Sequence, residues 1–206
     1  MRLKAEKINF KYNKGINILK DVDFSVESGE IVGLVAPSGY GKTTLAKILA
    51  GYEKPQSGKV ILEGSQRNKR EYNPVQLIFQ HPERAVNPLW KMSKIVSESG
   101  EPSKELMDAM GIKESWLNRW PTELSGGELQ RFCVLRVLNE KTKFIIADEM
   151  TTMLDAITQA QIWSIVLNYA RENNIGVVVI SHERPLVDKI CDRVIDLDKE
   201  YKQNRF

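Results

Sequence analysis

The sequence predicts an α/β fold with a mostly parallel sheet. Short runs rich in Val and Ile alternate with helical patterns along most of the chain. The runs are apolar at consecutive positions, which indicates strands that are covered on both faces, as in parallel sheets. In such folds the ligand crevice lies at the carboxyl ends of the strands. The runs expected to be strands are 31–35, 75–79, 144–147, 177–180 and 194–197.

Apolar residues at helical spacing follow the first of these runs and separate the third from the fourth. They are Leu45, Ile48 and Leu49, and then Ile162, Ile165, Val166, Tyr169 and Ala170. A shorter helix is expected before the last run, because Pro185 suits the first turn of a helix.

Two regions depart from this alternation. Residues 2–26 show short alternating segments around a turn at 13–15, which predicts an antiparallel flap. Between 82 and 139 the strand-like runs disappear and charged helical sequence takes over, which predicts a helical insertion. We expect one domain, 1–206, divided into an α/β core, 1–81 and 140–206, and a helical subdomain, 82–139.

Composition excludes several classes of protein. The 206 residues are 42% hydrophobic and 28% charged with a net charge of +3, which is typical of globular domains and excludes disordered and fibrous chains. The basic residues are scattered, with the densest cluster at Arg67, Lys69 and Arg70, so no nucleic-acid partner is expected. The longest apolar run, 31–36, is far shorter than the roughly 20 residues of a membrane-spanning helix. The two cysteines lack the spacing of a metal site, so we expect buried thiols in a reducing compartment.

Residues 36–44 read Ala-Pro-Ser-Gly-Tyr-Gly-Lys-Thr-Thr and lie between the first strand and a helix, which is the context of a phosphate-binding loop. Gly39 and Gly41 allow backbone amides to face phosphate oxygens, next to the positive end of the helix dipole. We expect Lys42 to neutralise the β and γ phosphates and the Thr43 hydroxyl to ligate Mg²⁺.

Two carboxylates, Asp148 and Glu149, follow the strand at 144–147. Neighbouring residues at a strand end point in different directions. Asp148 can therefore reach a Mg²⁺ ion, while Glu149 faces a water in line with the γ phosphate as a general base or water orienter. Alone, an acidic pair is equally typical of a solvated turn. Together with the phosphate-binding loop, it predicts a nucleotide hydrolase.

A second feature lies in the helical region, where Ser125 is followed three residues later by Glu128. This spacing is a capping box at the start of a helix. Gly126 and Gly127 lie between them and leave the first amides of the helix open to an anion. The residues alone leave both interpretations open, a simple helix cap or an anion-binding site.

Taken together, the motifs in residues 12–196 resemble the ATP-binding subunits of ATP-binding-cassette (ABC) transporters. Residues 124–128 resemble the signature motif of this family, which in a head-to-tail dimer contacts the γ phosphate held by the partner's loop. Gln80 is similar to the Q-loop glutamine, residues 152–155 to the D-loop, and His182 to the switch histidine.

The resemblance implies ATP and Mg²⁺ as cofactors and a full set of contacts. Tyr12 matches the aromatic residue that stacks on adenine, Gln80 would relay to the membrane partner, and His182 would contact the γ phosphate. The implied catalytic residues are Lys42, Glu149 and His182, and the implied metal ligands are Thr43, Gln80 and Asp148. The implied nucleotide-binding residues are Tyr12, Pro37, Ser38, Gly39, Tyr40, Gly41, Lys42, Thr43, Thr44, Gln80, Ser125, Gly126, Gly127, Glu128, Asp155 and His182.

The resemblance also implies partners. The subunit would dock on separate transmembrane permease subunits at the cytoplasmic face of the cell membrane, and pair head to tail with a second cassette, a copy or a paralogue. Residues 80–88 and 159–162 resemble the oligopeptide, dipeptide and nickel import branch. The implied function is an ATPase that powers import of peptides, nickel or metal chelates.

Two other functions remain open. A cassette ATPase of DNA repair, chromosome organisation or translation shares the motifs, although the segment between Thr43 and Ser125 has no room for the long coiled coils of chromosome-type cassettes. A nucleotide-sensing cassette with weak hydrolysis would depend on two departures from the family pattern, Ala36 for the first loop glycine and Met150 for proline. Alanine costs about 1–2 kcal/mol only where the backbone needs a positive φ.

Overall fold

The centre of the computed structural model is a five-stranded parallel sheet. Its strands are β3 (Ile31–Val35), β5 (Val75–Ile78), β6 (Phe144–Asp148), β7 (Gly176–Ile180) and β8 (Arg193–Asp196). They lie in the order β5-β6-β7-β3-β8, and every neighbouring pair is parallel. The five predicted strands are thus confirmed, with ends that shift by at most one residue. The structure describes residues 1–12, 15, 17–64, 72–152 and 154–200.

Both faces of this sheet are buried, which explains why its strands are apolar at consecutive positions. Along β6, Phe144 and Ile146 pack in one hydrophobic cluster, together with residues of the antiparallel sheet. Ile145 and Ala147 pack in a second cluster, together with residues of the helical region. The sheet therefore separates two cores, and its edge at the strand ends remains free to hold polar side chains.

The predicted flap is a three-stranded antiparallel sheet in the order β2-β1-β4. Strands β1 (Arg2–Phe10) and β2 (Leu19–Glu27) lie in the predicted stretch, whereas β4 (Ser57–Glu63) was not predicted. The side chains of β4 are all exposed or half-buried, so its sequence lacks the clear alternation that marks a strand. The sequence features that lie outside the described residues are Asn13 and Lys14 of the expected turn and the basic cluster of Arg67, Lys69 and Arg70.

Helices connect the parallel strands as expected. Helix α1 (Lys42–Ala50) follows β3, α5 (Ala156–Glu172) connects β6 to β7, and α6 (Arg184–Ile190) connects β7 to β8, which leads into α7 (Leu197–Glu200). Pro185 lies in the first turn of α6. Of the two free thiols, Cys133 is buried as expected, whereas Cys191 is half-buried. Among the helices within the described residues, none has the length and apolar character needed to cross a membrane.

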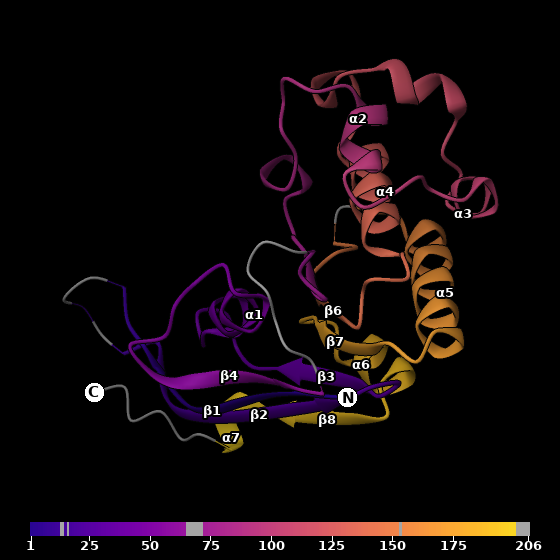
Figure 1. Cartoon of the computed structure of the whole chain (residues 1–206). Helices are drawn as coiled ribbons and strands as arrows, with labels where there is room; N and C mark the ends of the chain where they lie inside the picture. The colour runs from indigo at the N-terminus through magenta and orange to yellow at the C-terminus, as the bar shows by residue number, and fades with distance from the viewer. Residues whose placement is uncertain (13–14, 16, 65–71, 153, 201–206) are drawn as a thin grey trace.

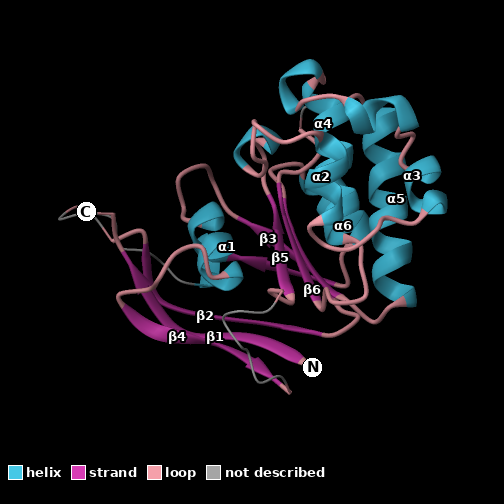
Figure 2. Ribbon diagram, turned by 45° about the horizontal axis from the view of Figure 1, so that its top comes forward, coloured by secondary structure: helices cyan, strands magenta, loops and turns pink. Residues whose placement is uncertain are grey.

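The helical insertion leaves the sheet between β5 and β6, which are neighbours in the sheet. It contains α2 (Met92–Ser97), α3 (Lys104–Ala109) and α4 (Gly126–Val137), with short 3₁₀ turns at Pro82–Arg84, Glu114–Asn118 and Pro121–Glu123. Figures 1 and 2 show that these helices gather on the side of the parallel sheet away from the antiparallel sheet. Because β5 and β6 are parallel, the insertion leads from the carboxyl end of β5 back to the amino end of β6.

Candidate nucleotide site

Four of the predicted site segments follow the carboxyl ends of parallel strands. The phosphate-binding loop follows β3, Gln80 follows β5, Asp148 and Glu149 close β6, and His182 follows β7. Because these strands are parallel and adjacent, their carboxyl ends share one edge of the sheet. The fold therefore gathers residues that are up to about 145 positions apart in the sequence.

The loop turns into α1 through glycines in the left-handed region, at φ 80° for Gly39 and φ 85° for Gly41. A Cβ on Gly41 would lie 2.7 Å from Leu19 Cδ2, so this position requires glycine for both space and backbone angle. A Cβ on Gly39 would meet nothing within 4 Å, because Gly39 borders open space. Among the described residues, four non-glycine residues have a positive φ, and Ala36 is not one of them. The replacement of the first loop glycine by Ala36 thus causes no backbone strain.

Lys42 begins α1 and folds its ammonium group back over the loop. Its Nζ donates to the carbonyl oxygens of Ala36 at 2.7 Å and Pro37 at 3.2 Å. Burial lowers the pKa of Lys42, while the carboxylates of Glu149 and Asp148 raise it in part. A cation is therefore held between the loop and the acidic pair, where a phosphate chain would lie.

Asp148 is buried, and its carboxylate accepts a hydrogen bond from the Thr43 hydroxyl. Burial raises the pKa of Asp148, and the Thr43 contact lowers it in part. The Oδ1 atom of Asp148 is buried and has no hydrogen-bond partner among the described residues. An unpartnered carboxylate oxygen beside a hydroxyl is costly without a donor or a cation, and it fits Mg²⁺, which prefers oxygen ligands.

Glu149 contacts other residues than Asp148 does, as expected for neighbouring residues at a strand end. Its Oε2 accepts a 2.9 Å hydrogen bond from Gln80 Nε2, and its Oε1 lies 3.6 Å from Nδ1 of His182. The backbone of Glu149 has φ 49°, a conformation that non-glycine residues rarely adopt. The chain thus accepts a strained backbone at the position expected to act on water.

Thr152 holds this strained backbone, a role that the sequence did not reveal. Its hydroxyl donates to the Glu149 carbonyl at 3.1 Å, and its N–H reaches the same oxygen at 3.3 Å. The neighbouring Thr151 is buried, and its hydroxyl accepts from Trp163 Nε1 of α5 at 3.2 Å. Two threonines that follow the acidic pair after Met150 are the sequence signal of this support.

Tyr12 lies beside the loop from the antiparallel sheet. Its hydroxyl is 3.5 Å from the Thr44 hydroxyl, and its ring packs edge to face on Phe10 at 4.8 Å between centroids. With 47% of its surface exposed, Tyr12 is partly open to solvent. Of the remaining loop residues, Pro37 and Ser38 are exposed and Tyr40 is half-buried.

The signature-like segment forms a separate group. Ser125 caps α4 by accepting from the Glu128 N–H at 3.2 Å, and the Glu128 carboxylate accepts from the Ser125 N–H at 2.8 Å, which confirms the predicted capping box. A cavity of about 580 Å³ lies here, lined by residues 125–128, Leu154 and Asp155, among others. Asp155 itself caps α5 by accepting from the N–H groups of Ile157 and Thr158. Ser125–Glu128 and Asp155 are thus brought together, at a place distinct from the strand-end edge.

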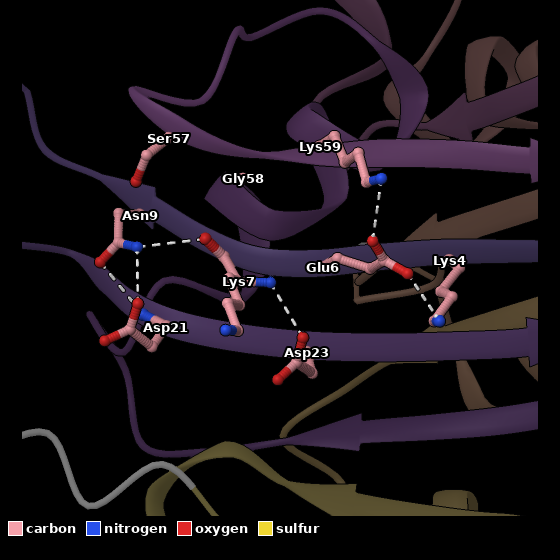
Figure 3. Close-up of a pocket in the computed structure, with 9 residues that line it drawn as sticks. All are labelled: Lys4, Glu6, Lys7, Asn9, Asp21, Asp23, Ser57, Gly58 and Lys59. Atoms are coloured by element: carbon pink, nitrogen blue, oxygen red, sulfur yellow. Dashed lines mark hydrogen bonds and ion pairs between the residues drawn. The ribbon is translucent and has the colours of Figure 1, made fainter.

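The largest cavity described, about 870 Å³, lies elsewhere, on the outer surface of the antiparallel sheet. Figure 3 shows that its charged side chains pair with one another, as Glu6 does with both Lys4 and Lys59. Asn9 similarly donates to Asp21 at 2.9 Å. These groups satisfy each other, so the strand-end edge, and not this surface, carries the candidate chemistry.

Known proteins resemble this chain in sequence and in fold. A probable peptide ABC transporter ATP-binding protein of Sinorhizobium fredii is 33% identical, over 87% of this chain and 56% of that protein, so the chain spans about half of that relative. The nickel import system ATP-binding protein of Staphylococcus aureus is 32% identical over 95% of this chain and 86% of that protein. An ATP-binding cassette solved as a dimer with ADP and Pi has a TM-score of 0.79 at 26% identity, covering 94% of this chain and 93% of that one.

The family match covers much of the candidate site, but not Tyr12, Asp155 or His182. Residues 19–152 match the family described as ABC transporter, a range that includes the phosphate-binding loop, Gln80, Ser125 and the acidic pair. The parallel sheet, the antiparallel sheet and the helical insertion together form the fold of the ATP-binding cassette. This chain therefore belongs to the ABC transporter family.

Proposed function

We propose that this chain is the ATP-hydrolysing subunit of an ABC importer. One observation carries the proposal most directly: Thr43 and Asp148 contact each other beside the Lys42 loop, while Glu149 is held by Gln80 at the same sheet edge. Phosphate binding, an oxygen site for a cation and a carboxylate that can act on water are the parts that phosphoryl transfer to water requires.

In the proposed site, ATP lies along the loop. The amides that follow Gly39 and Gly41 face the phosphates, Lys42 exchanges its contacts with loop carbonyls for phosphate oxygens, and the Tyr12 ring stacks on adenine. The remaining proposed contacts come from the loop, namely Pro37, Ser38, Tyr40, Thr43 and Thr44. Thr43, Asp148 and Gln80 would hold Mg²⁺, which supplies neutralisation of the charge on the β and γ oxygens.

Glu149 is the proposed general base. Its carboxylate accepts a proton from, or orients, the water that attacks the γ phosphorus, while the bond to the β–γ bridging oxygen breaks to give ADP and phosphate. Gln80 fixes the direction of this carboxylate through the 2.9 Å hydrogen bond. His182, whose side chain is 62% exposed and lies beside the other oxygen of the Glu149 carboxylate, is the proposed contact of the γ phosphate.

We propose that Ser125–Glu128 and Asp155 act on the ATP of a second cassette, a copy or a paralogue arranged head to tail. Their separation from the strand-end edge supports this, because one chain presents both groups on different parts of its surface. The whole chain would act as one ATPase domain, with 1–81 and 140–206 as the nucleotide-binding core and 82–139 as the helical subdomain. One hydrophobic cluster contains residues of both parts, such as Phe132 and Ile145, which supports a single domain.

Transmembrane permease subunits are the proposed membrane partners, and they would hold the chain at the cytoplasmic face of the membrane. Relatives bear the names peptide, nickel import and D,D-dipeptide transport ATP-binding protein, which supports peptides, nickel or metal chelates as the solutes. A nucleotide-sensing cassette is less well supported, because Ala36 causes no backbone strain and Met150 is buried in the hydrophobic core.

Two measurements test the proposal. Phosphate release from ATP should require Mg²⁺ and be saturable in the purified complex, and integral membrane proteins should co-purify with the chain from detergent. A complex that binds ATP without releasing phosphate would support the nucleotide-sensing alternative. A hydrolysing chain that co-purifies with no membrane protein would support a cassette ATPase outside transport.

A further inference from the structure

Three side chains of α4 donate hydrogen bonds to three carbonyl oxygens of the segment 79–85, which contains Gln80. Gln130 Nε2 donates to Phe79 at 3.3 Å, Cys133 Sγ to Pro82 at 3.8 Å, and Arg136 Nη2 to Ala85 at 2.8 Å. Donors and acceptors are each spaced by three residues. Residues three apart lie on neighbouring positions of a helix surface, so the three bonds form one row along α4. We call this set the carbonyl row.

The donors of the carbonyl row are polar side chains. Apolar side chains at these positions would be buried at a lower cost in free energy. Gln130 is 2% exposed, and its Oε1 atom is buried without a hydrogen-bond partner among the described residues. A buried acceptor without a hydrogen-bond partner lowers the stability of the fold. The Gln130 amide nitrogen therefore binds the Phe79 carbonyl, while its unpaired amide oxygen lowers the stability of the chain.

The row joins the two groups of the proposed site. Phe79 precedes Gln80, whose amide holds Glu149, and α4 begins at the capping box of Ser125 and Glu128. A displacement of Gln80 along the chain direction would move the three carbonyl groups. Because these groups are hydrogen-bonded to α4, the helix would move with them. Arg136 strengthens the last contact, because its guanidinium also pairs with Glu98 at 3.3 Å.

We propose that Gln130 and Arg136 are positioning residues that fix the register of the signature helix against the Gln80 segment. Gln130 and Arg136 thereby set the position of Ser125–Glu128 when this segment contacts the ATP of the partner cassette. This inference rests on the proposed function, because the signature acts only when ATP is hydrolysed between two cassettes.

The test replaces Gln130 by methionine, which keeps the length of the side chain and removes both polar atoms. In the complex with its co-purified partners, Gln130→Met should lower kcat roughly tenfold, a usual size for coupling between sites. The KM for ATP should change less than about twofold, because no phosphate contact is altered. Arg136→Met should act in the same direction, and Arg136→Lys, which retains a donor, should restore part of kcat.

Gln161→Met is the matched control. Gln161 Nε2 also donates to a main-chain carbonyl, that of Ala109, at 3.2 Å, and joins α5 to α3 outside the row. This variant should keep the wild-type kcat. A second control combines Gln130→Met with Gln80→Ala, in which the row has lost its link to Glu149, so no further loss of kcat is expected.

Equal kcat values for Gln130→Met and Gln161→Met in a hydrolysing complex would overturn the inference. The inference would also fail if Gln130→Met lowered kcat by the same factor in the wild-type and in the Gln80→Ala background. The Gln130 side chain would then act independently of Gln80. A wild-type complex that does not hydrolyse ATP would overturn both the proposed function and this inference.

Discussion

The Nε2 atom of Gln80 donates a 2.9 Å hydrogen bond to Oε2 of Glu149. These residues follow β5 and close β6, strands that are neighbours in the sheet but are separated in the sequence by the whole helical insertion. His182, after β7, lies 3.6 Å from the other oxygen of the same carboxylate. Three adjacent strand ends therefore converge on Glu149, so its direction depends on the tertiary fold and not on local sequence.

Lys42→Ala should weaken ATP binding at least about tenfold, because hydrogen bonds to charged groups contribute about 1.5–3 kcal/mol. The wild-type ammonium already lies over the loop, bonded to Ala36 and Pro37. Isothermal calorimetry with a non-hydrolysable ATP analogue measures the affinity, with the exposed Lys54→Ala as control. Unchanged affinity in Lys42→Ala would mean that the loop does not hold the phosphates.

Asp148→Asn should raise the stability of the nucleotide-free chain and weaken its Mg²⁺-dependent nucleotide binding. Burial raises the pKa of Asp148, so the folded chain binds more protons than the unfolded chain between the two pKa values, and stability falls as pH rises through this window. Above this window the full penalty applies, and removing it should contribute about 1 kcal/mol.

Thermal unfolding from pH 3 to 8 checks this result. The difference in melting temperature between Asp148→Asn and wild type should be small in acid and grow as pH rises. The exposed Asp108→Asn variant should have the wild-type melting temperature at each pH. A destabilised Asp148→Asn at pH 7 would show that the carboxylate stabilises the fold and is not held there at a cost.

Tyr12→Ala should weaken binding of ATP and GTP alike by about 5- to 150-fold, since stacking on an aromatic ring contributes about 1–3 kcal/mol per base and accepts any base. Tyr12→Phe should retain most of the affinity, because the 3.5 Å contact with Thr44 is at the limit of a hydrogen bond. Fluorescence titration with labelled nucleotides compares the three proteins. Equal affinities for Tyr12→Ala and wild type would place the base elsewhere.

The sequence predicts the parallel sheet well because burial of both faces leaves a simple mark, an unbroken apolar run such as 177–180. Strand β4 was missed because its side chains are only partly covered, so its residues need not alternate. The capping box was found because Ser125 and Glu128 interact locally, three residues apart.

Contacts that depend on the fold could not be found in the same way. Glu149 and its left-handed backbone are fixed by Gln80 from another strand and by the Thr152 hydroxyl, and no local pattern records either. The polar face of α4 that binds Phe79, Pro82 and Ala85 is similarly hidden, since Gln130 in a sequence is typical of an exposed helix position.

The composite site can be tested by mixing two inactive variants. Ser125→Arg should leave ATP binding by the single chain nearly intact, because Ser125 lies apart from the phosphate loop, while its bulk blocks the partner's site. Lys42→Ala supplies the complementary defect. In a mixed dimer both defects fall on one composite site and the other stays intact, so ATPase activity should partly return.

Ser125→Ala is the control for the lost helix cap, which alone costs about 1 kcal/mol. It should reduce the stability of α4 without blocking the partner's site. Loss of nucleotide binding by the single Ser125→Arg chain would show that the signature acts on the ATP of its own chain, contrary to the head-to-tail arrangement.

Glu149 is proposed to act on water at the strand-end edge. Phosphate release from radiolabelled Mg-ATP in a single turnover, compared between wild type and Glu149→Gln at equal nucleotide occupancy, tests it most directly. Glutamine keeps an acceptor for Gln80 but cannot take a proton, so release should slow by at least ~10²-fold while ATP affinity is unchanged and ATP-bound dimers accumulate. Phosphate release by Glu149→Gln at the wild-type rate would rule out this role, because Glu149 would then be only a turn residue at the end of β6.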